Sequence, residues 1–315
     1  MRELIAVPNV SEGSDPAILA AVAAAFTAGG NARILDVHSD PDHGRTVFTL
    51  AGLPGRLAVA LGRGAEAAAG AIDLTAHAGA HPHVGALDVA PVVFLDAVQR
   101  PAALAEALAA AAEIAARGLP VFLYGALAGG RTRAQLRHGG VRELARRVAG
   151  EEAGGGLHLG SDMEPERRSP PRDPRPLVAD FPAERVGPGI DPRRGAVLVA
   201  ARAPLVAFNL ELAAPATLSD ARAIAARIRE GGPDGLPGLR AIGIELVARG
   251  GVAQVSMNVE DHLGLPLGVV IEAVARLAPV AAAEIVGLAP AAAFARYPDG
   301  LLTRGRRTLE AALGA

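Results

Sequence analysis

The segment over residues 151–176 most constrains how this chain can fold. It holds three consecutive glycines followed by MEPERRSPPRDPRP, a run rich in proline and arginine. Such a stretch cannot continue a helix and has little apolar area to bury. It divides a chain of 315 residues into two parts, each long enough for its own core. We therefore predict an N-terminal subdomain over 1–150, a linker over 151–178 and a C-terminal subdomain over 179–315.

Both parts alternate strand-like apolar runs with longer helical patterns. In the first part, we predict strands over 4–8, 32–37, 46–51, 88–95 and 119–124, and helices over 16–27, 53–71, 101–116 and 131–148. In the second part, we predict strands over 196–200, 205–212, 239–247, 252–259 and 283–288, and helices over 218–230, 266–277 and from Pro290 onward. The turn Arg249-Gly250-Gly251 pairs two of these strands, which argues against a purely parallel sheet. The pattern predicts an α/β (α+β) protein with two subdomains, each a mixed β-sheet covered by helices.

The composition excludes several classes of chemistry. The chain has no cysteine, and all 31 of its basic residues are arginine. Disulfides, thiolate nucleophiles, cysteine metal centres and catalytic lysines are therefore excluded. A formal charge of −2 argues against a nucleic-acid partner. The N-terminus lacks the features of a signal peptide and no long uncharged apolar run is present, so we expect a cytoplasmic protein without a membrane span.

Five of the eight histidines lie between His38 and His83, and three of them fall in the loop Thr75–His83. Histidine changes its protonation near neutral pH, and loops present reactive groups on a rigid scaffold. One interpretation is that His81 is a general acid and base, and the other is a set of surface histidines on a turn. A metal site with Asp36 or Asp40 is a weaker alternative, because the spacing does not match the helical HExxH pattern.

Two further polar segments flank predicted strands. Arg45 begins a strand after the turn-rich segment 36–44, where a guanidinium can grip a carboxylate with two hydrogen bonds. The segment 7–13 joins a strand to a helix, a common position for ligand contacts. Turn chemistry and helix capping explain the same residues without a ligand. The pattern Gly62-x-Gly64-x-x-Ala67 is similar to a dinucleotide fingerprint, but it lies inside a predicted helix and is discounted.

Several motifs in one order together resemble the formiminotransferase domain family. They are VPNVSEG, LDVHSDPDHGRTVFTLAG, GAHPHVGALDVAP and VFLYG in the first part, and ADF, GAVLVAARAPLVAFNLEL, AIGIELV, AQVSMNVEDH and EIVGLAP in the second. The resemblance covers about residues 2–295. It implies a homodimer of two-subdomain chains with folate bound in a groove between the subdomains, and no metal. The cyclodeaminase domain of some relatives is expected to be absent, because the chain ends too early to hold it.

The resemblance also implies an activity and a set of site residues. The activity is transfer of the formimino group from N-formimino-L-glutamate to N5 of tetrahydrofolate, the co-substrate. The family's catalytic histidine corresponds to His81, and its folate-binding loop corresponds to residues 182–195. With the polar segments above, the expected substrate and folate contacts are Asn9, Ser11, His38, Asp40, Arg45, Thr46, Pro182, Ala183, Glu184, Arg185, Val186, Gly187, Pro188, Gly189, Ile190, Asp191, Pro192, Arg193, Arg194, Gly195, Arg202 and Asn209.

The chain departs from the family pattern at several polar positions. Pro182, His83, Gly44, Ala203 and Gly268 stand where the family usually has Gly, Arg, Asn, Lys and His. These changes leave the identity of the transferred group open. A related folate-dependent formyl transferase and a non-catalytic folate-binding paralogue remain alternatives.

Overall fold

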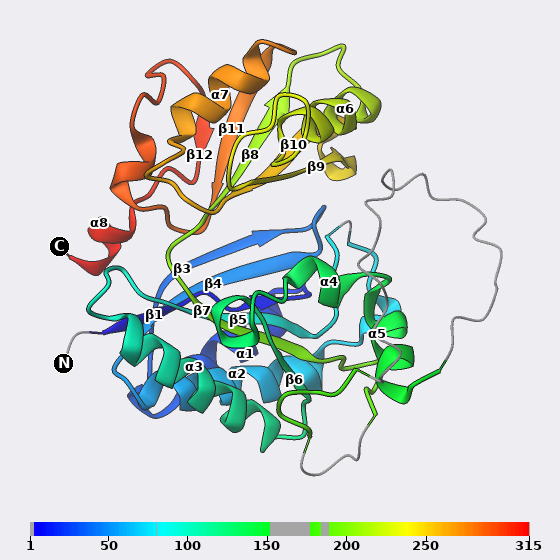
Figure 1. The fold of residues 1–315 in the computed structure, drawn as a ribbon, viewed down its shortest axis with the longest axis vertical. Helices are drawn as coiled ribbons and strands as arrows, with labels where there is room; N and C mark the ends of the chain where they lie inside the picture. Colours follow the sequence, from blue (N-terminus) through cyan, green and yellow to red (C-terminus); the bar gives the residue numbers. More distant parts are fainter. Residues whose placement is uncertain (1–2, 80, 152–176, 184–188, 315) are drawn as a thin grey trace.

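Two mixed β-sheets, each with its own helices, form two lobes that face each other (Figure 1). The computed structural model describes residues 3–79, 81–151, 177–183 and 189–314. Most of the predicted linker lies outside these residues. The predicted fold class, two subdomains with mixed sheets covered by helices, is confirmed.

The first sheet has strand order β1-β4-β2-β5-β7-β6, with β3 paired to β4. β5 and β6 run parallel to β7, whereas the other pairs are antiparallel. Its strands are β1 (Leu4–Ala6), β2 (Asn9–Val10), β3 (Arg33–Asp40), β4 (Arg45–Gly52), β5 (Leu87–Val93), β6 (Val121–Leu123) and β7 (Val197–Arg202). We placed β7 in the C-terminal subdomain, but it completes the first sheet, and the chain crosses between lobes at 203–205. A strand's local sequence does not specify which of two sheets it joins.

Helices cover both faces of the first sheet, but unevenly. α1 (Pro16–Thr27), α2 (Arg56–Ala71) and α3 (Arg100–Ala115) pack on one face through alanine, valine and leucine side chains. α4 (Arg133–Arg137) and α5 (Gly140–Ala149) cover only the β6–β7 end of the opposite face. The predicted single helix over 131–148 was wrong, because Gly139 and Gly140 both have a φ of 72° and interrupt it. The rest of this opposite face is left for the second lobe (Figure 1).

The second sheet has strand order β12-β11-β8-β10-β9. The predicted pairing of 239–247 with 252–259 is confirmed as β9 with β10. Its elements are β8 (Val206–Leu212), β9 (Leu239–Leu246), β10 (Val252–Val259), β11 (Val280–Val286), β12 (Thr303–Arg304), α6 (Leu218–Ile228), α7 (Leu267–Ala275) and α8 (Leu309–Leu313). The predicted helix from Pro290 onward was wrong. Prolines and the left-handed Gly305 limit that region to a short 3-10 turn, β12 and α8.

The two faces of the second sheet differ in polarity. Phe208 and Leu210 of β8 belong to the core beneath α6 and α7. Asn209 and Glu211 alternate with them and face the first lobe, although they are buried. Contacts to the β3–β4 hairpin join this polar face to the first lobe: Nε2 of His43 lies 3.2 Å from Oε1 of Gln254. None of the described helices is long and apolar enough to span a bilayer.

The packing of α1 on α2 generates a test of the first lobe's core. A Cβ added at Gly64 would lie 2.0 Å from Cε1 of the buried Phe26, whereas a Cβ at Gly70 of the same helix would meet no atom within 4 Å. Alanine favours a helix over glycine by about 1 kcal/mol at either position. We expect Gly70→Ala to raise the free energy of unfolding by up to about 1 kcal/mol, and Gly64→Ala to lower it by roughly 1–3 kcal/mol through overpacking.

Urea denaturation followed by circular dichroism measures both changes. Gly70→Ala is the matched control, since it has the same helix propensity gain without the clash. Equal stabilisation by both substitutions would contradict the close approach of Gly64 to Phe26.

Candidate functional site

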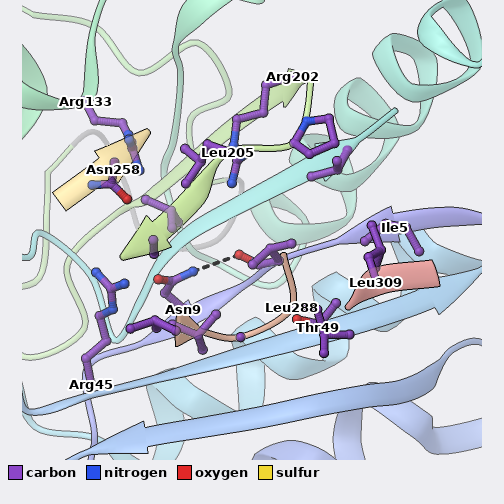
Figure 2. A pocket seen from close by; sticks show the side chains of 18 residues that line it. Ile5, Asn9, Arg45, Thr49, Arg133, Arg202, Leu205, Asn258, Leu288 and Leu309 are labelled. Carbon is purple, nitrogen blue, oxygen red and sulfur yellow. Dashed lines mark hydrogen bonds between the residues drawn. The ribbon is translucent and has the colours of Figure 1, made fainter. Parts of the chain in front are cut away.

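A groove lies where the open face of the first sheet meets the polar face of the second. It consists of two adjoining hollows, with about 630 Å³ and about 400 Å³ of empty space, partly open to solvent. Both are lined by Arg45 and Val47 from β4 and by Ala207, Asn258 and Val286 from the second sheet. Figure 2 shows the larger hollow, into which Arg45, Arg133 and Arg202 extend with Asn9 and Asn258. His81 lines the smaller hollow, opposite Asn209 and Ser256.

Two glycines bring the histidine loop to the groove. Gly44, in the turn of the β3–β4 hairpin, has a φ of 61°, and a Cβ there would lie 2.6 Å from Cα of Gly79. A Cβ at Gly79 would lie 2.4 Å from the carbonyl oxygen of His43. Because neither residue has a side chain, the two backbones pack against each other, and the His81 amide donates to the His43 carbonyl over 3.3 Å.

His81 faces a guanidinium. Nη1 of Arg45 is in hydrogen-bond contact with Nε2 of His81. An arginine has only donors, so Nε2 accepts this bond and the imidazole is neutral. Burial lowers the pKa of His81 well below its usual value, and the nearby cations Arg45, Arg137 and Arg133 lower it further, together with His43. Burial also lowers the pKa of Arg45 to about 9.

Three arginines line the larger hollow without an acidic partner. Among the described residues, no carboxylate forms an ion pair with Arg45, Arg133 or Arg202. Nε of Arg202 is buried without a hydrogen-bond partner among the described residues, and burial lowers the pKa of this residue to about 10. The neighbouring Arg137 does have a partner, the buried Asp88. A half-buried cation without a counter-charge is unfavourable, and an anionic ligand with several carboxylates would offset that cost.

The rest of the lining of the smaller hollow is mostly polar. The side-chain amide of Asn209 donates to Glu284 over 3.1 Å, and Nε2 of His38 lies 3.8 Å from the same carboxylate. Burial nevertheless lowers the pKa of His38. Oδ2 of Asp40, which also lines this hollow, is buried and has no hydrogen-bond partner among the described residues. The smaller hollow therefore offers a ligand amide groups and the carboxylate of Asp40, whose Oδ2 lies 4.0 Å from Nη2 of Arg249.

The structure brings together seven of the site residues predicted from the sequence. Those that line the groove are Asn9, His38, Asp40, Arg45, His81, Arg202 and Asn209. Ser11 and Thr46 lie beneath it, because their hydroxyls donate to the backbone oxygens of Gly85 and Glu12 over 2.8 Å and 2.7 Å. Both are buried and support the hairpin and the histidine loop from below.

The described part of the predicted folate-binding loop, residues 182–195, does not line the groove. Glu184, Arg185, Val186, Gly187 and Pro188 lie outside the described residues. The remaining predicted loop residues line neither hollow; they are Pro182, Ala183, Gly189, Ile190, Asp191, Pro192, Arg193, Arg194 and Gly195. The end of this loop holds the base of the histidine loop: Gly195 bridges to Gly85, and Arg193 forms an ion pair with Asp73 at 2.9 Å. Its role in folate binding stays a prediction.

Sequence reasoning did not select some groove residues. Arg133 follows no recognisable motif, and its contribution depends on where α4 packs at the β6–β7 end of the sheet. Ser256 and Asn258 alternate with the buried Val255 and Met257, and this alternation was the available signal for a polar sheet face. The departure at Gly268 is structural, because a Cβ there would lie 2.2 Å from the Arg296 carbonyl oxygen. The described residues contain no group of three or more acidic or histidine side chains able to hold a metal ion.

Comparisons with known proteins identify the family of this chain. The formiminotransferase domain, N-terminal subdomain, matches residues 4–202, and the formiminotransferase domain matches residues 207–306. A formimidoyltransferase-cyclodeaminase of Sus scrofa is 32% identical over 302 residues, which are 92% of this chain and 51% of that protein. The chain thus spans about half the length of such bifunctional relatives.

Shorter relatives match over most of their own length. The glutamate formimidoyltransferase of Streptococcus pyogenes is 32% identical over 298 residues, covering 91% of this chain and 89% of that protein. The enzyme of the same name from Thermoplasma acidophilum is 30% identical over 292 residues, covering 90% and 87%. The chain belongs to the formiminotransferase family.

Proposed function

We propose that this protein is a glutamate formimidoyltransferase, which moves the formimino group of N-formimino-L-glutamate to N5 of tetrahydrofolate. The observation that carries the proposal is one groove that holds a neutral imidazole beside three arginines with no acidic partner among the described residues. The names of the Streptococcus and Thermoplasma relatives support it. We also propose that it is a homodimer, as the family resemblance implies, and that it is cytoplasmic.

The reaction needs a group that takes and returns a proton. N5 of tetrahydrofolate attacks the amidine carbon, a tetrahedral intermediate forms, and the C–N bond to glutamate breaks. The attacking nitrogen loses one proton, and the departing amine of glutamate gains one. A neutral His81 accepts the first proton and delivers it to the leaving nitrogen. Holding the two substrates side by side in the groove supplies much of the remaining acceleration.

The groove also matches the charges of the two substrates. Formiminoglutamate and the glutamate tail of folate both carry carboxylates, which arginine binds with two parallel hydrogen bonds. Arg45, Arg133 and Arg202 are the cations of the larger hollow. The pterin ring presents N–H donors and a carbonyl. Oδ2 of Asp40, which has no hydrogen-bond partner among the described residues, and the amides of Asn209 and Asn258 are suitable partners for them.

A direct transfer assay with tetrahydrofolate and formiminoglutamate tests the proposed role of His81. We expect His81→Ala to fold normally and to lower turnover at least about a hundredfold, because proton transfer by one side chain contributes roughly 10²–10⁴ in rate. His138→Ala, a change of an exposed histidine at the end of α4, is the matched control and keeps wild-type turnover.

Near-normal turnover by His81→Ala would remove His81 from the mechanism. The same assay with 5-formyltetrahydrofolate and glutamate separates formimino from formyl transfer, since only the preferred group supports rapid turnover. If neither pair reacts while tetrahydrofolate raises the melting temperature, the protein is a folate-binding paralogue.

A second prediction concerns Arg202. We expect Arg202→Gln to raise the KM for a carboxylate substrate roughly 10–100-fold, because a hydrogen bond to a charged group contributes about 1.5–3 kcal/mol. Its kcat changes much less, since the larger hollow is separate from the His81 nitrogen. Arg276→Gln, at the exposed end of α7, is the control with the same loss of charge. Unchanged KM values for both substrates in Arg202→Gln would exclude a carboxylate contact.

A further inference from the structure

The contact between Arg45 and His81 is incompatible with base catalysis as it stands. Nε2 of His81 accepts a hydrogen bond from Nη1 of Arg45, so its lone pair is already occupied. A proton from a substrate nitrogen can reach that atom only after the guanidinium withdraws. A protonated His81 would place two donors against each other beside a full positive charge. With this contact in place, the imidazole is neutral and its Nε2 is blocked.

Arg45 is also the charged residue that lines both hollows. It lines the smaller one with His81 and the larger one with Arg133 and Arg202. No carboxylate of the described residues pairs with it, although Asp40 lies opposite it in the β3–β4 register. An anion entering the larger hollow is therefore the partner that Arg45 lacks.

The other charged groups around His81 do not block its Nε2. The groups that face it are His38 and Asp40 of β3, His43 of the hairpin turn, Arg45 of β4 and, from α4, Arg133 and Arg137. Arg137 is neutralised by its ion pair with Asp88, and His38 is directed to Glu284. Of the cations, only Arg45 is in contact with the ring among the described residues. Removing or neutralising that one charge has the largest effect on the imidazole.

We propose that Arg45 is a positioning residue that keeps His81 blocked until a substrate carboxylate binds in the larger hollow and draws the guanidinium away. The carboxylate forms a bidentate pair with Arg45, which cancels its charge and frees Nε2 of His81 for the substrate nitrogen. The base is thus unblocked only when a carboxylate-bearing substrate is present. This inference rests on the proposed function, because it assigns the trigger for the base that the transfer needs.

Nuclear magnetic resonance of the full chain tests this without any turnover. The ring signals of the eight histidines are followed against pH, and the His81→Asn spectrum identifies the His81 signal. Glutarate, a dicarboxylate without an amine, is the probe. We expect saturating glutarate to raise the pKa of His81 by about 1 pH unit or more, the effect of neutralising one adjacent charge. In Arg45→Gln the pKa is already raised, and glutarate moves it no further.

The kinetic profiles give a second readout. The acid limb of kcat/KM reports the free enzyme, and that of kcat reports the bound state. In the wild type, we expect kcat to fall at a higher pH than kcat/KM, because binding raises the pKa of His81. In Arg45→Gln the two limbs coincide. Arg276→Gln keeps the wild-type separation and controls for the loss of one positive charge.

Two outcomes would overturn the inference. One is a His81 pKa in the wild type that is the same with and without glutarate, including the case in which glutarate does not bind. The other is a glutarate-induced shift that persists in Arg45→Gln. The wild-type titration alone decides the question if Arg45→Gln fails to fold. A shift without any transfer activity would reject the proposed reaction but not the role of Arg45, whereas normal transfer without a shift would reject only the role of Arg45.

Discussion

The groove depends on the approach of two backbones at Gly44 and Gly79. Any side chain at either position would force the histidine loop away from the β3–β4 hairpin, since the nearest backbone atoms lie within 2.6 Å of the added Cβ. The hairpin carries Arg45, and the loop carries His81, so this contact also sets the distance between the two groups. Gly13 adds a third constraint, because a Cβ there would lie 2.2 Å from the carbonyl oxygen of Asp40. Apolar packing stabilises each sheet, whereas these glycines set the positions of Arg45 and His81 in the groove between the sheets.

The second sheet turns an unusual face to this arrangement. A sheet that packs helices on one side commonly leaves its other side to solvent or to an apolar partner. Here the other side carries Asn209, Glu211, Gln254 and Glu284, all buried against the first lobe. Arg249 and Arg304 supply the matching charges, each bonded to Glu211. A hydrogen-bonded polar interface of this kind holds the two lobes in one relative position. It also leaves room for water and polar ligands, which a close-packed apolar contact would exclude.

The sequence predicted the architecture better than the geometry of the site. Periodicity placed most strands and helices. The predicted helix over 16–27 is α1, and Asp15 caps it by accepting from the amides of Ala17 and Ile18. The sequence pattern did not assign β7 to the first sheet, because its parallel pairing with β5 and β6 joins residues that are far apart in the sequence. Arg45 was identifiable from its position at a strand start. The position of Arg133 at the same hollow was not identifiable, because it depends on where α4 packs on the sheet.

The unpaired arginines show why stability and function compete in this groove. Asp88 gives Arg137 a buried partner, and that pair fixes α4 to β5 at no cost to the cavity. The same solution for Arg45 or Arg202 would stabilise the free protein, since a buried cation without a counter-charge is unfavourable. An internal carboxylate would also occupy the hollow, and Arg45 would then pair with it whether or not substrate is bound. Burial lowers the pKa of Arg45 and of Arg202, because the charged form of each guanidinium loses hydration in the groove. A ligand that brings its own carboxylates stabilises both charges on binding, which favours acidic substrates.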